Sequence, residues 1–272
     1  MKFVIGLCKP GEKIYDICMK SDQYLRDALT KVYQKKKHFK GLSFPTSISL
    51  NEVCGNFSPI AEESGLANDY RVLKEGDVAK IDMGVHINGF SAVIAHTVVV
   101  QASDEVVTGK KADVILAAYN AVQNALRTMH IKPENTNNVV TNNTKTICEA
   151  YKVAPVEGVL SHRMRRDIID GPEVIINQNT YDQKVEDREF AHGDVFGLEV
   201  MVSSGEGKPK EADLKCSVYK RAIENTYKLK TESGRKLLSV VEQNFHTFPF
   251  SFNAFDDTTN LKMKQKIVKI QL

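Results

Sequence analysis

The chain has 272 residues, of which 42% are hydrophobic and 26% are charged, and its formal net charge is +3, values typical of a soluble globular protein. No apolar stretch approaches the roughly 20 residues that a membrane helix needs, and the apolar run near the start is too short for a secretory signal, so we expect neither a membrane protein nor a secreted one. The five cysteines are odd in number, lie far apart and form no CxxC motif, which predicts reduced thiols in a cytosolic or nuclear protein.

The first third of the chain is predicted to form a helix, a short strand and a hairpin. Apolar residues at mostly three- and four-residue intervals favour an amphipathic helix over residues 13–36. The segment 41–59 mixes Gly, Pro, Ser and Asn with apolar residues, which suits a short strand with flanking loops. Residues 76–101 hold two β-branched runs on either side of Asn88-Gly89, which predicts a β-hairpin with its turn at these two residues.

The rest of the chain is predicted to mix helices and short strands. A helix over 108–129 is expected to bury one apolar face, and a second helix is expected near 137–151. The residues of that apolar face are Ala112, Ile115, Leu116, Tyr119, Val122 and Leu126. Further along, the sequence predicts strands at 172–178 and 194–203, a helix over about 233–245 and the start of another near 260.

An internal repeat links the two halves of the chain. The segment Gly76–Asp82 resembles Gly193–Glu199, and in each copy Gly-Asp-Val leads into an apolar run that contains a carboxylate. This match favours a duplicated fold of two similar α+β halves that face each other across a pseudo-twofold axis, although so short a match also arises by chance.

The two carboxylates of the repeat, Asp82 and Glu199, lie between apolar neighbours. A strand carboxylate often points to solvent, but a buried one needs a cation, a metal or a hydrogen-bond donor to offset its desolvation. In a duplicated fold, facing strands bring both carboxylates to one central place, as metal ligation requires. His162 lies beside a basic run, and a single histidine of this kind is more often a surface or core residue than a ligand.

Basic residues cluster at four places in the sequence. The clusters are Lys35, Lys36, Lys37 and Lys40; Arg163, Arg165 and Arg166; the segment 208–236; and Lys262, Lys264, Lys266 and Lys269. Clustered Lys and Arg could form an anion-binding face, but a single cluster of this kind is more often ordinary solvated surface.

Four segments, taken in order, resemble the methionine aminopeptidase family (peptidase family M24), in particular its type-two branch. They are the segments 41–59, 80–97, 158–171 and 193–207. The resemblance implies an α+β pita-bread (creatinase/aminopeptidase) fold, a single domain over 1–272 with pseudo-twofold halves at about 1–105 and 106–272. It also implies a helical insertion over about 215–272 and a fold truncated at its C-terminal end, before the final strands.

The resemblance further implies that the two-metal site of this family is only partly kept. Asp82, His162 and Glu199 stand at three of its ligand positions, but the second aspartate, which bridges the metals, is replaced by Val93. Its last glutamate belongs to a C-terminal strand that the chain does not reach. Because a two-metal centre holds its ions about 3.5–4 Å apart through bridging carboxylates, we expect no metal, no cofactor and no catalytic residue.

The two substrate-side histidines of the family fall on Asn56 and Asp170. The pattern of losses as a whole resembles that of the proliferation-associated, or ErbB-three-binding, subgroup of methionine aminopeptidase-like pseudoenzymes. The chain departs from this subgroup at Asn56, where the subgroup keeps a histidine, and at Glu199, where it has an aspartate. A working metal-dependent methionine aminopeptidase is the alternative, and it would need the missing glutamate from a longer chain and a base other than Asn56. A fragment without a stable function is a third interpretation.

The resemblance to this subgroup implies a non-catalytic RNA- and ribosome-binding protein linked to ribosome biogenesis, translation and growth control. The implied partners are the large ribosomal subunit and its rRNA, with peptides or proteins at the old cleft, for a monomer in the cytoplasm, nucleus and nucleolus. The residues carried over as RNA-binding are the basic residues of the insertion, namely Lys215, Lys220, Arg221, Lys228, Lys230, Arg235 and Lys236.

Overall fold

A computed structural model of the chain describes residues 1–60, 71–103, 105–212 and 217–255. The chain divides into two compact units. The first unit comprises residues 1–103, 166–168 and 214–272, and the second comprises 104–165 and 169–213. Residues 217–255 thus belong with the N-terminal part of the chain, whereas the division into halves near residue 105 and the bounds of the insertion stay predictions.

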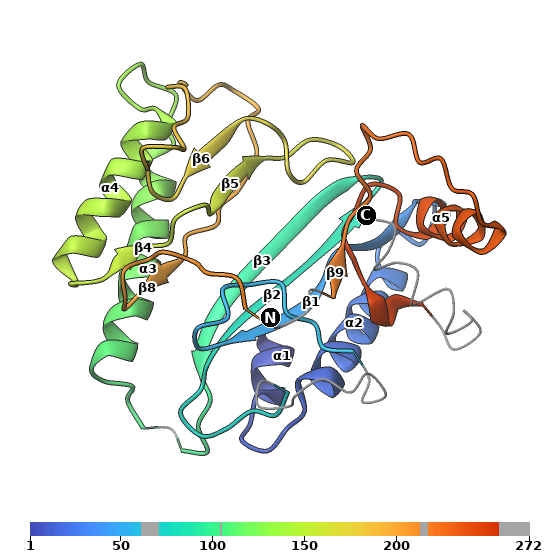
Figure 1. Ribbon diagram of the computed structural model, residues 1–272, viewed down its shortest axis with the longest axis horizontal. Coiled ribbons are helices and arrows are strands. Elements are labelled where there is room, and N and C mark those ends of the chain that lie inside the picture. Colours follow the sequence, from blue (N-terminus) through green and yellow to red (C-terminus); the bar gives the residue numbers. More distant parts are fainter. Residues whose placement is uncertain (61–70, 104, 213–216, 256–272) are drawn as a thin grey trace. The chain divides into compact units, whose positions relative to one another are not determined.

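The first unit is built on an antiparallel sheet in the order β1-β2-β3 (Figure 1). Its elements are α1 (Lys2–Leu7), α2 (Ile14–Thr30), β1 (Lys40–Leu50), β2 (Val78–Ile87), β3 (Phe90–Val99), β9 (Val218–Tyr219), α5 (Glu232–Asn244), β10 (Phe250–Ser251) and the short 3-10 helix η2 (Phe252–Ala254). Helix α2 covers one face of the sheet, and Ile14 and Ile17 pack there with Ile81 and Met83 of β2. Because side chains alternate along a strand, the even-numbered residues of β2 lie on the opposite face.

The predicted hairpin of the first unit is confirmed. Strands β2 and β3 pair in continuous register from Val78↔Val99 to Ile87↔Phe90. Asn88 and Gly89 connect them with φ angles of 52° and 85°, the left-handed backbone that a two-residue type I′ turn requires. The sequence therefore located both strands and the turn.

Two boundaries in the first unit differ from the prediction. Helix α2 ends at Thr30, before residue 36, because the Lys40 ammonium donates to the carbonyl oxygens of Leu29 (3.0 Å) and Val32 (2.6 Å) and closes the helix end. Strand β1 is a long strand and not a short one between loops. Pro45 lies where its register shifts, and the outer position of β1 in the sheet tolerates a residue without an N–H donor.

The second unit packs two helices with small sheets. Its elements are α3 (Lys110–Thr128), α4 (Asn137–Ala150), β4 (Ala154–Pro155), β5 (Leu160–Arg163), β6 (Val174–Ile176), β7 (Phe196–Gly197) and β8 (Val202–Ser203). Strands β6-β5-β7 form one antiparallel sheet and β4-β8 another. Both predicted helices are confirmed, whereas the predicted strands at 172–178 and 194–203 are present only as shorter pieces.

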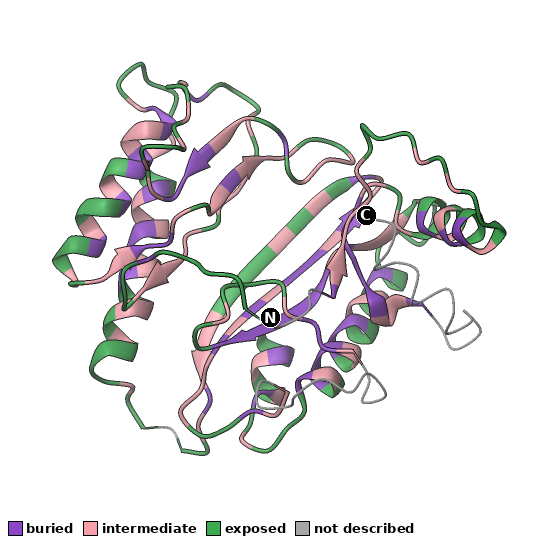
Figure 2. Cartoon of the chain, in the orientation of Figure 1, coloured by how far each residue is buried: buried purple, intermediate pink, exposed green. Residues whose placement is uncertain are grey.

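The buried face of α3 is not the predicted one. Leu116, Tyr119 and Leu126 are 47%, 60% and 53% exposed, whereas the stripe formed by Ala117, Ala121 and Ala125 is buried against α4 (Figure 2). The small alanine side chains let the two helices approach closely, and hydrophobic periodicity alone favours the larger residues.

The internal repeat has a matching backbone in both units. The turns at 74–77 and 191–194 each contain a left-handed glycine, with φ of 83° and 85°. In each turn the aspartate N–H donates to the carbonyl of the first residue at 3.1 Å. The aspartate carboxylate accepts the N–H of that residue at 2.8 Å in the first copy and 2.9 Å in the second. This shared turn supports the duplicated pita-bread architecture, although β2 is a long strand and β7 a short one.

In the part of the chain that the structure describes, no helix is both long and apolar enough to cross a membrane.

Candidate functional site

The first unit carries the position of one expected ligand and the lost bridging position. Asp82 is half-buried on β2, opposite Ser47 of β1 and Ala95 of β3. Val93 lies opposite Gly84, two residues from Asp82, and therefore on the same face of the sheet. A Cβ atom on Gly84 would lie 2.9 Å from Cγ1 of Val93, so the valine side chain occupies the space above this glycine. Val93 thus brings only hydrocarbon to the face of Asp82.

Short polar side chains share that face of the sheet. The hydroxyl oxygens of Ser43, Ser47 and Ser91 are buried and form no hydrogen bond with any residue that the structure describes. Ser47 lies opposite Asp82, and Ser43 approaches the position of the absent Gly84 side chain. Buried hydroxyls without partners are costly, and because these oxygens are shielded from solvent they are a local cost of the fold and not a ligand-binding surface.

His162 and Glu199 are neighbours in the second unit. Nδ1 of His162 lies 2.9 Å from the carbonyl oxygen of Gly171. Because a carbonyl can only accept, Nδ1 carries the hydrogen, and in the neutral ring the lone pair is on Nε2. The Ser161 hydroxyl fixes the backbone of Glu199, since it accepts the Glu199 N–H at 2.8 Å and donates to the Glu199 carbonyl oxygen at 3.2 Å.

Burial and the nearby His162 act in opposite directions on the pKa of Glu199. The residue as a whole is exposed, yet the protein around its carboxyl raises the pKa of Glu199, and the nearby His162 opposes that rise. Glu199 lies between β7 and β8 and not inside a strand as expected. These two residues could present one imidazole nitrogen and one carboxylate to a cation, which is a small donor set.

The two expected substrate-side positions, Asn56 and Asp170, belong to different units. Asn56 is exposed in the first unit with φ of 60°, and Asp170 is exposed in the second. Taken by itself, neither unit gathers three or more His, Cys, Asp or Glu side chains into a metal-binding group among its described residues.

The basic run at 163–166 is used inside the protein. Arg163 pairs with Glu173 at 3.0 Å and with Asp194 at 2.7 Å, and Arg188 pairs with Asp194 at 2.9 Å. Arg165 also pairs with Glu173. Burial raises the pKa of Asp194, but the Ala191 N–H and the two arginines outweigh burial and hold this pKa below its ordinary value. Sequence analysis missed these partners because they lie up to about thirty residues from the run.

Arg166 is likewise engaged, but in the first unit. Its Nε donates to the carbonyl oxygen of Asn88 at 2.9 Å, and its guanidinium lies 5.9 Å from the centre of the Phe90 ring. The run of arginines therefore does not present a set of unpaired cations.

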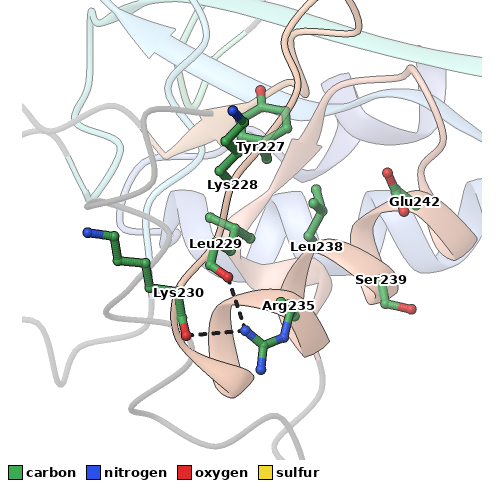
Figure 3. A pocket seen from close by; sticks show the side chains of 8 residues that line it. All are labelled: Tyr227, Lys228, Leu229, Lys230, Arg235, Leu238, Ser239 and Glu242. Atoms are coloured by element: carbon green, nitrogen blue, oxygen red, sulfur yellow. Dashed lines mark hydrogen bonds between the residues drawn. The ribbon is translucent and has the colours of Figure 1, made fainter.

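A different basic cluster surrounds a pocket of about 590 Å³ in the first unit (Figure 3). Helix α5 and the segment before it line this pocket, which we call the basic pocket. Its lining residues are Tyr227, Lys228, Leu229, Lys230, Arg235, Leu238, Ser239 and Glu242. Helix α5 begins after Thr231, whose hydroxyl accepts the Gly234 N–H at 3.2 Å and caps the helix.

The three cations of the basic pocket differ in whether their charged groups contact other residues of the protein. Nη1 of Arg235 donates to the carbonyl oxygens of Leu229 (3.1 Å) and Lys230 (3.2 Å), which fixes the guanidinium (Figure 3). Lys228 and Lys230 are exposed, and neither ammonium forms an ion pair or a hydrogen bond with a residue in the described ranges. Three expected RNA-binding residues therefore meet at one pocket.

The remaining expected RNA-binding residues have other surroundings. Lys236 pairs with Glu232 at 2.8 Å one turn away on α5. Arg221 pairs with Glu242 at 3.2 Å, and Lys220 is half-buried with partners of its own. Lys215 lies outside the described residues. The apolar lining of the pocket was not predicted, although the alternation of apolar and basic residues at 227–230 is a visible signal for it.

Comparison with known proteins identifies the family. Residues 1–230 match the metallopeptidase family M24. The chain is 42% identical to a Schizosaccharomyces pombe protein named curved DNA-binding protein, over 97% of this chain and 69% of the relative. It is 39% identical to proliferation-associated protein A of Dictyostelium discoideum, over 94% of this chain and 65% of that relative. The chain thus spans about two thirds of the length of these relatives.

Solved structures agree on the fold. The structure of a thermophilic Arx1 superposes with a TM-score of 0.87 at 29% identity, covering 99% of this chain and 77% of that one. Methionine aminopeptidase of Thermotoga maritima superposes with a TM-score of 0.57 at 21% identity, covering 76% of this chain and 75% of that one. With the matching turns of the repeat, these likenesses establish the pita-bread fold, and the chain belongs to the metallopeptidase family M24, among the relatives named proliferation-associated proteins.

Proposed function

We propose that the chain is a non-catalytic member of its family that binds RNA and associates with the large ribosomal subunit through the basic pocket. The proposal places it in ribosome biogenesis, translation and growth control, in the cytoplasm, nucleus and nucleolus. The observation that carries the proposal is the meeting of Lys228, Lys230 and Arg235 at one pocket, with two of these cations unpaired among the described residues.

The charges of this pocket suit a phosphate backbone. Lys and Arg that neutralise phosphates release condensed counterions, so three such contacts give a slope of log affinity against log salt of about −2 to −3. RNA duplexes are recognised mainly through backbone and shape, and a surface of lysines and one fixed arginine needs no sequence code. A sharp loss of affinity at raised salt is therefore expected.

The relatives add support of a general kind. The S. pombe relative is named for binding curved DNA, and DNA presents the same phosphodiester chemistry as RNA. The resemblance to the proliferation-associated proteins directs the proposal to ribosomal RNA.

The non-catalytic part of the proposal rests on donor chemistry. The two-metal mechanism needs bridging carboxylates to hold the ions that acidify a water molecule. Val93 offers no lone pair at a bridging position, and the exposed amide of Asn56 is not a base. The residues present do not fit such a centre, and we assign no catalytic step to Asp82, His162 or Glu199. Binding of a peptide or protein segment at the old cleft remains part of the proposal, and the resemblance to the family supports it.

A matched pair of charge reversals tests the RNA-binding part. The double variant K228E/K230E reverses two cations of the pocket, whereas K208E/K210E reverses two exposed lysines of the second unit. Fluorescence anisotropy with a short RNA duplex should show a loss of about tenfold or more for the first variant and a much smaller loss for the second. Equal losses in both variants would mean that only overall charge matters, and the pocket would not be the docking site.

A further inference from the structure

The basic pocket also has an apolar lining that a phosphate backbone does not use. Tyr227, Leu229 and Leu238 are partly buried, whereas Lys228, Lys230 and Arg235 are exposed. Leu238 lies outside the cluster of buried residues around Phe250 that forms the nearby core. It therefore keeps apolar surface that the fold does not use.

The lining residues are held in place. The Tyr227 hydroxyl accepts the Ala222 N–H at 3.0 Å, which fixes the direction of the ring. Leu229 packs near the first turn of α5, since a Cβ atom on Gly234 would meet its side chain at 3.7 Å. With Arg235 fixed by two carbonyl oxygens, this part of the pocket is preorganised, and a ligand has mainly the two exposed lysines to order.

The charge of the pocket stays positive despite one acidic residue. Glu242 is the acidic residue among the described lining residues, and its Oε1 accepts from Nη1 of Arg221 at 3.2 Å. Arg221 thus offsets Glu242, and Lys228, Lys230 and Arg235 remain as excess positive charge.

An apolar floor with a cationic rim discriminates between forms of nucleic acid. In a regular A-form duplex the bases are stacked inside the helix, so the duplex presents phosphates and sugars but no apolar group to fill a pocket. An unpaired base can be turned out of the helix and packed against protein side chains. A volume of about 590 Å³ lies within the range of pockets that hold small organic groups.

We propose that the basic pocket binds one unpaired nucleotide, with its base against Leu229 and Leu238 and its phosphates against Lys228, Lys230 and Arg235. This inference rests on the RNA-binding function proposed above. It adds that the chain prefers RNA with a bulged or looped-out nucleotide to RNA that is fully paired. Ser239 and Glu242 also line the pocket and offer polar groups to the sugar or the base edge.

Two RNA hairpins that differ by one bulged adenosine test the inference with the full chain. Fluorescence anisotropy should show that the bulged hairpin binds about tenfold more tightly, because burial of the apolar face of one base contributes of the order of tenfold in affinity. The variant Leu238→Gln keeps the size of the side chain but removes its apolar character. It should abolish the preference, so that the bulged and the paired hairpin bind with the same salt-sensitive affinity.

The control is Ile223→Gln, which makes the same kind of change at an exposed apolar residue that does not line the pocket. It should keep the full preference, and thermal melting checks that both variants fold. The comparison of the two hairpins with the unmodified chain needs no variant and keeps the inference testable if Leu238→Gln fails to fold.

The outcomes separate this inference from the function on which it rests. Equal, salt-sensitive binding of both hairpins would overturn the single-nucleotide inference and leave RNA binding intact. Absence of binding to either hairpin would overturn RNA binding itself. A preference that survives Leu238→Gln would place the base elsewhere. Displacement of the bulged hairpin by a doubly phosphorylated peptide more readily than by paired RNA would make the pocket a phosphopeptide site instead.

Discussion

Two basic clusters of the molecule resemble each other in composition and differ in what they contact. Arg163 and Arg188 converge on Asp194, whose side chain is only 5% exposed. Lys228 and Lys230 line a pocket without an ion pair to any residue in the described part of the chain. Cations paired with a buried carboxylate stabilise the fold, whereas unpaired surface cations add little stability and remain available to an anionic ligand. A charge cluster is thus informative about binding only after its internal partners are known.

The largest expected effect is on the paired cluster. The substitution Asp194→Ala leaves the guanidinium groups of Arg163 and Arg188 without their shared carboxylate and removes the side-chain acceptor of the turn at Ala191. We expect the free energy of unfolding to fall by about 3 kcal/mol, as measured by urea denaturation. The matched change Asp182→Ala, at an exposed residue, should stay within about 0.5 kcal/mol of the unmodified chain. Similar losses of unfolding free energy in both variants would show that Asp194 stabilises the fold no more than an exposed aspartate does.

Lowering the pH should weaken the same cluster and reduce the stability of the protein by less than the substitution Asp194→Ala does. Because the pKa of Asp194 is lower in the folded protein than in the unfolded chain, its contribution to stability is complete above the ordinary pKa of an aspartate and is lost as the pH falls through the folded value. The slope from one such group is at most about 1.4 kcal/mol per pH unit. Below about pH 4, the free energy of unfolding should therefore fall less steeply with decreasing pH for Asp194→Ala than for the unmodified chain, as urea denaturation at several pH values would measure.

The unpaired cluster should show almost no effect on stability. We expect the double variant K228E/K230E to change the free energy of unfolding by less than about 0.5 kcal/mol, because both side chains are exposed and unpaired among the described residues. The same denaturation assay used for Asp194→Ala checks this. A large loss of stability would show that these lysines support the fold, and any loss of RNA binding could then not be assigned to direct contact.

The smallest expected effect is that of metal ions. Cobalt, manganese or zinc should leave the melting temperature of the chain unchanged, because Val93 offers hydrocarbon at a bridging position. A metal bound at one hundred times its Kd would add about 2.7 kcal/mol of stability, which a thermal melt detects readily. A rise in melting temperature that is lost in His162→Ala would contradict the non-catalytic proposal and favour a metal-dependent peptidase.

Much of the local fold follows from the sequence, since its signals are short-range. Asn88-Gly89 between two β-branched runs specifies the hairpin, and the two long helices of the second unit follow from their periodicity. Tertiary packing decided the rest. The alanine stripe of α3 is buried because α4 approaches closely, and Lys40 ends α2 from outside the helix. Neither effect is visible in a window of periodic residues.

The sequence assigned the ligand positions of the family, but it did not reveal the apolar lining of the basic pocket. Resemblance to the family assigned Asp82, Val93, His162 and Glu199 to ligand positions, and the structure adds that His162 and Glu199 are neighbours. The basic pocket combines a helix with the segment before it, and its apolar lining depends on how Leu238 packs. Spacing in the sequence does not contain that information, and neither does it show that Asp194 engages the arginines near residue 163.

The central claim, that the basic pocket attaches this chain to ribosomal RNA, is tested most directly by co-sedimentation with large ribosomal subunits at low and raised salt. The unmodified chain and K208E/K210E should sediment with the subunits at low salt and dissociate at raised salt, whereas K228E/K230E should stay in the supernatant. Co-sedimentation of K228E/K230E to the same extent as the unmodified chain, or no sedimentation of the unmodified chain at any salt, would contradict the account.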